Sequence, residues 1–204
     1  MKNLFGLLAR YPEAGKVKTR LALDVGGEGA ARVYKIIAER VFSNTFPDSD
    51  SDFGRMIFYS PPGEKSRFES WVPGVELLPQ RGRDIGEIMI NALQDLFDLG
   101  ASKAVITGVD IPDLNRTTIS DAFLKLEHAD VVIGPAEDGG YYLIGMKAEY
   151  PEIFQGISWS TGNVFIETVR AIERMGLSYS TVKTLSDVDR IEDIIRHDNL
   201  FRAL

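Results

Sequence analysis

The chain has 204 residues, of which 44% are hydrophobic and 26% are charged, as in an ordinary globular protein. Its 23 basic and 30 acidic side chains give a net charge of −7, so we expect neither nucleic acid nor a membrane surface among its partners. With no cysteine and two histidines, disulfides, thiolate nucleophiles and metal sites rich in cysteine or histidine are excluded. No apolar run suits a signal peptide or a membrane-spanning helix. We expect a single cytoplasmic domain spanning residues 1–204.

Apolar runs alternate with helical patterns along the chain. Residues 4–9 form a nearly continuous apolar run, which is typical of a buried parallel strand, and residues 30–43 carry apolar residues at helical spacing after a glycine-rich turn. Residues 44–53 form a polar acidic loop. This order predicts an α/β fold, a Rossmann-like and mostly parallel sheet with helices on both faces. Further strands are predicted at 56–59, 75–78, 104–106, 131–134, 141–146 and 181–185, and further helices at 65–71, 84–100, 118–126, 163–175 and 191–200.

The stretch V-I-T-G-V-D-I-P-D-L, residues 105–114, carries the first candidate for chemistry. Its apolar run breaks at Gly108, presents a carboxylate at Asp110 and stops at Pro112. Asp110 is therefore expected at the carboxyl end of a strand, the edge where ligands bind in open α/β sheets. The alternative is that Asp110 caps the helix predicted to follow, or shapes the turn.

A basic loop follows the first predicted strand. Residues 10–21, R-Y-P-E-A-G-K-V-K-T-R-L, hold four cations against one glutamate, a local charge of +4 − 1 = +3 in a chain of −7. The loop matches neither the P-loop nor the dinucleotide-binding fingerprint. Cations and glycine amides at this place predict a phosphate site, whereas the alternative is a solvated surface loop. The residues expected to bind phosphate are Arg10, Gly15, Lys16, Lys18 and Arg20, of which Lys18 and Arg20 are both expected to be exposed.

A second loop, Q-R-G-R-D-I-G, is expected to open on the same edge of the sheet. Its Gln80, Gly82 and Asp84 could contact a nucleobase or a phosphate. The alternative is structural, with a turn at Gly82 and a helix cap at Asp84.

Three later stretches carry acids, glycines or an aromatic residue. Asp138, in E-D-G-G-Y-Y-L-I-G, lies either in a loop that contacts substrate or in an ordinary tight turn. In I-S-W-S-T-G, Ser160 or Thr161 is expected to cap the next helix, and Trp159 belongs either to the core or to a lid. The pair Asp187 and Asp189 either caps the last helix or brings further acids to a metal at Asp110.

Together these motifs resemble the bacterial DUF2064 family. The resemblance rests on K-T-R-L, Q-x-G-x-D-I-G, G-V-D-I-P-D-L, E-D-G-G-Y-Y-L-I-G and D-V-D, spread from residue 10 to about residue 195. That family is grouped with the nucleotide-diphospho-sugar transferases of the GT-A fold. The chain is also similar, more distantly, to molybdenum cofactor and 2-phospho-lactate guanylyltransferases, which end in D-x-D-T-P-E-D-L. Here Arg190-Ile191 replaces Thr-Pro, which argues against transferring their substrates to this chain.

The resemblance implies a transferase that uses Mg²⁺ or Mn²⁺ and acts on a nucleotide and a small-molecule acceptor. Asp110 matches the family's metal-holding aspartate, and Asp187 or Asp189 matches the late acidic element. Lys16, Lys18 and Arg20 occupy the position of the loop that handles phosphates.

Three functions fit these residues. In nucleotidyl transfer, an acceptor phosphate attacks an NTP, while Lys18, Arg20 and a metal at Asp110 stabilise the departing pyrophosphate. In glycosyl transfer, the metal holds the diphosphate of an NDP-sugar and Asp138 is the base for an acceptor hydroxyl. The third is a non-catalytic nucleotide-binding regulatory module that kept the fold.

Overall fold

The computed structural model describes residues 2–45 and 53–197, which contain a seven-stranded sheet of order β3-β2-β1-β4-β6-β5-β7. All neighbouring strands pair in parallel except β6, which runs antiparallel to both β4 and β5. The expected mostly parallel sheet is therefore confirmed. The strands are β1 (Asn3–Arg10), β2 (Gly54–Ser60), β3 (Glu76–Pro79), β4 (Lys103–Gly108), β5 (Val131–Pro135), β6 (Tyr141–Met146) and β7 (Tyr179–Thr181).

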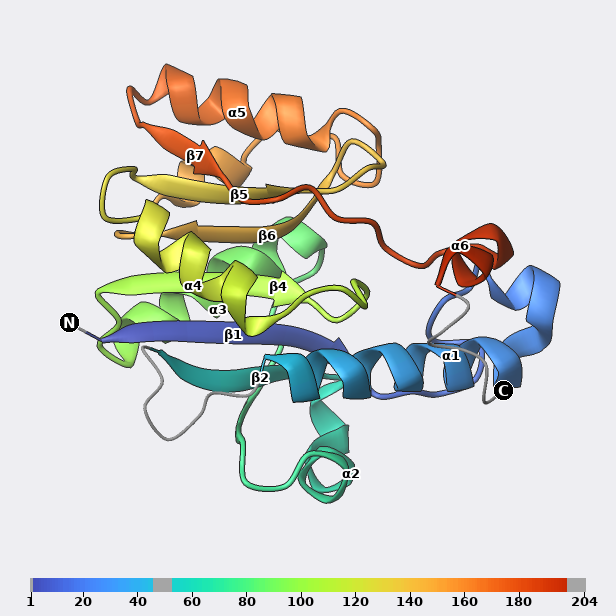
Figure 1. The fold of residues 1–204 in the computed structure, drawn as a ribbon. Helices are drawn as coiled ribbons and strands as arrows, with labels where there is room; N and C mark the ends of the chain where they lie inside the picture. The colour runs from blue at the N-terminus through green and yellow to red at the C-terminus, as the bar shows by residue number, and fades with distance from the viewer. Residues whose placement is uncertain (1, 46–52, 198–204) are drawn as a thin grey trace.

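Helices cover both faces of the sheet, because successive side chains of each strand point to opposite faces. In β1, Phe5 and Leu7 pack in a cluster with α1 and α4, whereas Leu4 packs in a second cluster with α3 and α5. Figure 1 shows α4 and α3 on opposite faces of the sheet. None of the described helices has the length and apolarity needed to cross a membrane. The helices are α1 (Ala22–Asn44), α2 (Lys65–Trp71), α3 (Ile85–Asp98), α4 (Arg116–Lys125), α5 (Val164–Arg174) and α6 (Ile191–Arg196), with 3-10 turns η1 (Pro62–Glu64) and η2 (Pro151–Phe154).

Most elements begin and end within three residues of their predicted bounds, but α1 and β7 differ by more. Helix α1 begins at Ala22 rather than at residue 30, and the expected turn is a kink at Gly26, whose φ of 73° and ψ of 163° are not helical. The last strand was expected at 181–185, but β7 ends at Thr181. The ladder between β5 and β7 ends at Ile133 and Thr181, and beyond it an isolated bridge joins Ala136 and Leu185. At the same end of β5, its register with β6 shifts between Gly134 and Pro135. Residues 46–52 of the expected acidic loop and 198–200 of the last helix lie outside the described residues.

The order of the strands reverses between β1 and β4. From β1 the chain continues to β2 and β3 on one side, and then crosses to β4 on the other. In open α/β sheets such a reversal leaves a crevice beyond the carboxyl ends of the two strands. The loops that follow β1 and β4 are therefore placed beside each other.

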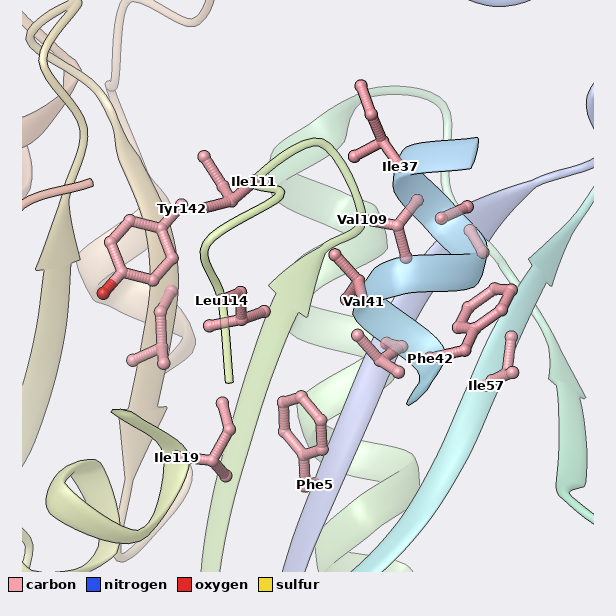
Figure 2. Close-up of a cluster of buried hydrophobic side chains, with 14 of the residues drawn as sticks. Phe5, Ile37, Val41, Phe42, Ile57, Val109, Ile111, Leu114, Ile119 and Tyr142 are labelled. Atoms are coloured by element: carbon pink, nitrogen blue, oxygen red, sulfur yellow. The ribbon is translucent and has the colours of Figure 1, made fainter. Parts of the chain in front are cut away.

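Apolar anchors fix the loop after β4. Val109 and Ile111, on either side of Asp110, are buried, and Leu114 is fully buried. Figure 2 shows these three side chains in one cluster with Val41 of α1. Since its two neighbours point into the core, Asp110 points outward, and its side chain is 46% exposed.

Replacing Leu114 tests this anchoring. We expect Leu114→Ala to lower the free energy of unfolding by about 2–5 kcal/mol, because it leaves a cavity in the cluster. Urea denaturation followed by circular dichroism measures the change. Leu124→Ala is the matched control, because Leu124 is 66% exposed on α4 and its loss should cost less than about 0.5 kcal/mol. Equal losses in the two variants would contradict the anchoring role of Leu114.

Candidate functional site

A cleft of about 860 Å³ opens beyond the carboxyl ends of β1 and β4. It brings together the cations of residues 10–20 and acids from four later segments of the chain. Gly15 and Gly82 are not among the residues that line it. The predicted site residues that do line the cleft are Arg10, Lys16, Lys18, Arg20, Gln80, Asp84, Asp110, Asp138, Asp187 and Asp189.

Lys18 lies at the centre of the charged part of the cleft. Its Nζ is 2.7 Å from Oδ1 of Asp110 and 3.1 Å from Oδ1 of Asp189. The other carboxylate oxygen of Asp189, Oδ2, accepts a hydrogen bond from Arg20. The expectation that Lys18 is exposed is wrong: its side chain is 3% exposed, whereas that of Arg20 is 63% exposed as expected. Burial lowers the pKa of Lys18, but the charges of Asp110 and Asp189 outweigh this effect and raise the pKa above its ordinary value. The two carboxylates thus stabilise a buried ammonium.

Asp187 faces the same group of acids. Burial and the neighbouring charge of Asp189 raise its pKa to about 6, against the opposing effect of Lys18. Asp138 and Asp110 also raise this pKa, so several carboxylates share one region of the cleft. Such repulsion among acids is relieved by a cation.

The carboxylates suit a metal that arrives with phosphates. Among residues 2–45 and 53–197, no group of three or more acids or histidines is arranged as a ready-made metal site. Mg²⁺, however, takes only one or two protein carboxylates and completes its shell with phosphate oxygens and water. Asp110 and Asp187 provide ligands of this kind, so the donor set fits Mg²⁺ or Mn²⁺.

The segment that carries Asp187 and Asp189 is anchored in the same way as the loop after β4. Val188, between the two acids, is buried, and its N–H donates to the carbonyl oxygen of Asp110 at 3.3 Å. The cap expected from these acids is provided instead by Asp193, which accepts hydrogen bonds from the backbone of Asp189 and Arg190. The C-terminal segment therefore joins the loop after β4 at the cleft.

The loop after β3 has clear structural roles. Asp84 accepts a hydrogen bond from the Glu87 N–H at 2.9 Å, as the helix-cap alternative predicts. The amide of Gln80 donates to the carbonyl oxygens of Ala9 and Phe58, at 3.1 and 2.8 Å, and so ties the ends of β1 and β2 together. Gly82 has a φ of 142°, and a Cβ there would overlap the backbone of the first turn of α3. These residues shape one side of the cleft.

Tyr34 of α1 also belongs to the cleft, although sequence analysis missed it. Its hydroxyl accepts a hydrogen bond from the Arg10 N–H at 2.8 Å and donates to the Arg10 carbonyl oxygen at 3.1 Å. Burial, and then the charge of Asp110, raise the pKa of Tyr34 and keep it neutral. In the sequence Tyr34 is one residue of an apolar helical stripe, so no pattern distinguished it.

Residues 157–163 form another side of the cleft that sequence analysis did not assign to the site. The Thr161 hydroxyl donates to the Ser158 carbonyl oxygen at 2.7 Å, and the Ser158 N–H donates to Glu167 at 2.7 Å. Trp159 is half-buried, and its indole ring packs against Gly86 of α3. The contact is so close that a Cβ at Gly86 would lie 2.9 Å from the ring. The expected cap at Ser160 or Thr161 is wrong, since α5 begins at Val164 directly after Asn163.

The turn that carries Asp138 packs tightly on this loop. Asp138 accepts a hydrogen bond from the Gly140 N–H at 2.9 Å, which closes the turn between β5 and β6. Gly139 has a φ of 88°, and a Cβ there would overlap the carbonyl oxygen of Gly162. This close approach explains why glycine is present at position 139.

Comparison with known proteins gives one family and several similar structures. The family model described as uncharacterized proteins conserved in bacteria (DUF2064) matches residues 47–161, more than half of the chain. A structure from Desulfovibrio desulfuricans G20, assigned provisionally as a nucleotide-diphospho-sugar transferase, is 34% identical, with a TM-score of 0.89 over 98% of this chain and 88% of that chain. No protein with a curated description matches.

Two more distant structures share the fold. CMP:2-keto-3-deoxy-manno-octonic acid synthetase complexed with CTP is 12% identical, with a TM-score of 0.56 over 99% of both chains. Rv0371C of Mycobacterium tuberculosis H37Rv, complexed with manganese, is 10% identical, with a TM-score of 0.53 over the whole of both chains. The expected nucleotide-diphospho-sugar transferase fold is thus confirmed, and the named transferases among these proteins agree with the expectation of a transferase.

The pH dependence of stability tests the buried ion pairs. Because the pKa of Lys18 is raised on folding, its stabilising effect is complete below about pH 10 and is lost as the pH rises through the folded-state value. We expect Lys18→Met to reduce the fall in unfolding free energy between about pH 10 and pH 12, measured by urea denaturation. Lys65→Met, at an exposed position on α2, should leave that fall unchanged. Identical pH profiles for Lys18→Met and the wild type would contradict the ion-pair role.

A pair of glycine variants tests the contact between the two turns. Gly139→Ala and Gly156→Ala both place a side chain at a positive φ, but only Gly139 faces another backbone atom within 4 Å. We expect Gly156→Ala to cost about 1–2 kcal/mol and Gly139→Ala clearly more, in thermal or urea unfolding. Equal costs would show that the turns are not in contact.

Proposed function

Because this chain belongs to the DUF2064 family, we propose that it is a metal-dependent transferase whose nucleotide substrate binds through its phosphates in the cleft between β1 and β4. The observation that carries this proposal is that the cations of residues 10–20 and the acids Asp110, Asp187 and Asp189 line one cleft. Cations bind phosphate oxygens, and carboxylates bind the accompanying metal. The switch point of the sheet is also where nucleotides bind in such folds.

Asp110 and Asp187 would hold Mg²⁺ or Mn²⁺, which when bound neutralises phosphate charge. Lys16, Lys18 and Arg20 bind the phosphate oxygens, and the backbone of Arg10 is held in place by Tyr34. Asp189 positions both Lys18 and Arg20 through ion pairs. The complexes of CTP and of manganese with proteins of this fold support the same assignment of ligands.

Two reactions use these groups, and a separate observation favours each. The relative that is 34% identical, provisionally a nucleotide-diphospho-sugar transferase, favours an NDP-sugar as substrate, with Asp138 as the base that takes the proton of an acceptor hydroxyl. The four cations of residues 10–20 favour a triphosphate, and hence nucleotidyl transfer to an acceptor with release of pyrophosphate.

Calorimetric titration with NTPs and NDP-sugars, with and without Mg²⁺, tests the proposal and separates the two reactions. We expect Mg²⁺-dependent binding of one nucleotide, with preference for the NTP or for the NDP-sugar identifying the reaction. Asp110→Asn, which keeps the shape of the side chain, should abolish the Mg²⁺ dependence. Absence of nucleotide binding under all conditions would overturn the proposal.

Arg20 allows binding to be separated from stability. We expect Arg20→Ala to weaken nucleotide binding by roughly tenfold or more, because it removes a charged hydrogen-bond donor. The unfolding free energy should change by less than about 1 kcal/mol, since an exposed ion pair contributes little. Arg170→Ala, at an exposed position on α5 that does not line the cleft, should change neither quantity. A loss of stability without a loss of affinity would make Arg20 a structural residue.

A further inference from the structure

We propose that the side of the cleft formed by the β5–β6 turn and residues 157–163 binds an uncharged, hydroxyl-bearing ring of the sugar class, with Trp159 as the surface on which the ring packs. This inference rests on the proposed function, because it assigns the part of the cleft that the nucleotide phosphates leave open. We call this side the tryptophan wall, formed by Asp138, Gly140, Trp159, Ser160 and Thr161, all of which line the cleft.

The distribution of charge in the cleft carries the argument. The lining cations are Arg10, Lys16, Lys18, Arg20 and Arg83. Arg10 ends β1, the next three lie in the loop that follows it, and Arg83 is paired with Glu87 at 2.5 Å. Residues 136–142 and 157–164, all of them described, contain no lysine or arginine. A phosphate at the tryptophan wall would therefore find no cation among the residues of the wall, and the charge of Asp138 would repel it, while Glu87 already neutralises Arg83.

The chemistry of the wall suits a neutral polyhydroxylated ring. An indole ring provides a flat apolar face against which the C–H groups of such a ring can pack. Around it, the exposed Ser160 presents a hydroxyl group, and the exposed carboxylate of Asp138 has acceptor capacity beyond its bond to the Gly140 N–H. An apolar face with a few polar groups at its edge is typical of small-molecule sites.

The wall is also held in place before any ligand binds. Trp159 rests against Gly86 of α3, where any larger residue would displace the indole ring. Hydrogen bonds from Thr161 to Ser158 and from Ser158 to Glu167 fix the loop that carries it. A preorganised aromatic surface loses little conformational entropy on binding.

The ring can reach the wall in two ways, either attached to a nucleoside diphosphate or as a separate acceptor.

The chain has two tryptophans, so Trp71→Phe leaves Trp159 as the only tryptophan reporter. Trp71 does not line the cleft, and it packs in an aromatic group with Phe68 and Phe42 that phenylalanine can fill. Emission and iodide quenching of this variant then report contacts at the wall.

The first titration compares three pairs in Mg²⁺: UDP with UDP-glucose, GDP with GDP-mannose, and ADP with ADP-glucose. For the pair that binds, we expect the sugar ester to protect Trp159 from iodide and the diphosphate alone to leave it accessible. The second titration adds glucose or glucose 1-phosphate to protein saturated with the diphosphate. If glucose protects Trp159 from iodide, and glucose 1-phosphate protects it no better, the ring belongs to a separate acceptor.

Variants of Trp159 complete the test. By calorimetry, Trp159→Ala should bind the sugar-bearing ligand about tenfold more weakly while the affinity for the diphosphate is unchanged, and Trp159→Phe should retain most of the affinity. Circular dichroism checks that both variants are folded.

Three results would overturn the inference. If a nucleoside diphosphate binds but no sugar protects Trp159 from iodide, the tryptophan wall does not bind a sugar ring, and the proposed function is unaffected. Protection by UTP or glucose 1-phosphate, but not by an uncharged ring, would show that the wall binds phosphate. Failure of every nucleotide to bind would overturn the proposed function, and the inference with it.

Discussion

The positive charge buried at Lys18 can be accommodated only with carboxylates beside it, and the arrangement of the cleft follows from this requirement. Asp110 comes from the loop after β4, and Asp189 comes from the segment before α6. One ammonium group thus joins three segments that are remote in the sequence. Under the proposed function, a nucleotide with its metal supplies alternative partners for both charges: phosphate oxygens for Lys18 and a divalent cation for Asp110.

The acids themselves are positioned by apolar residues. Asp110 lies between buried Val109 and Ile111, and Val188 is buried between Asp187 and Asp189. In both segments the apolar side chains are buried in the core, and the carboxylates beside them therefore face the cleft. Hydrophobic packing, which has no directional preference of its own, therefore produces a directed array of charges.

Local patterns in the sequence were sufficient to predict much of this architecture. Continuous apolar runs identified the buried strands, and Asp110, after such a run, was expected at the carboxyl end where it lies. The burial of Lys18 could not be predicted in this way, because it depends on carboxylates 92 and 171 positions away along the chain. Tyr34 was missed, and Trp159 was left between the core and a lid, for a related reason: their places depend on Arg10 and Gly86, to which no sequence pattern connects them. The end of β7 depends on where its pairing with β5 stops, which the local sequence does not specify.

The ion pair between Lys18 and Asp189 also has a consequence for how the protein acquires its function. It closes one of the longest chain loops in the molecule, with 171 positions between its ends. Contacts so distant in sequence are costly in chain entropy and tend to form after local ones. A partly folded molecule with its central strands paired would still lack the last carboxylate of the charged cluster. Under the proposed function, the ability to bind a nucleotide is therefore expected to appear only at the end of folding, so that the ligand binds fully folded molecules and not partly folded ones.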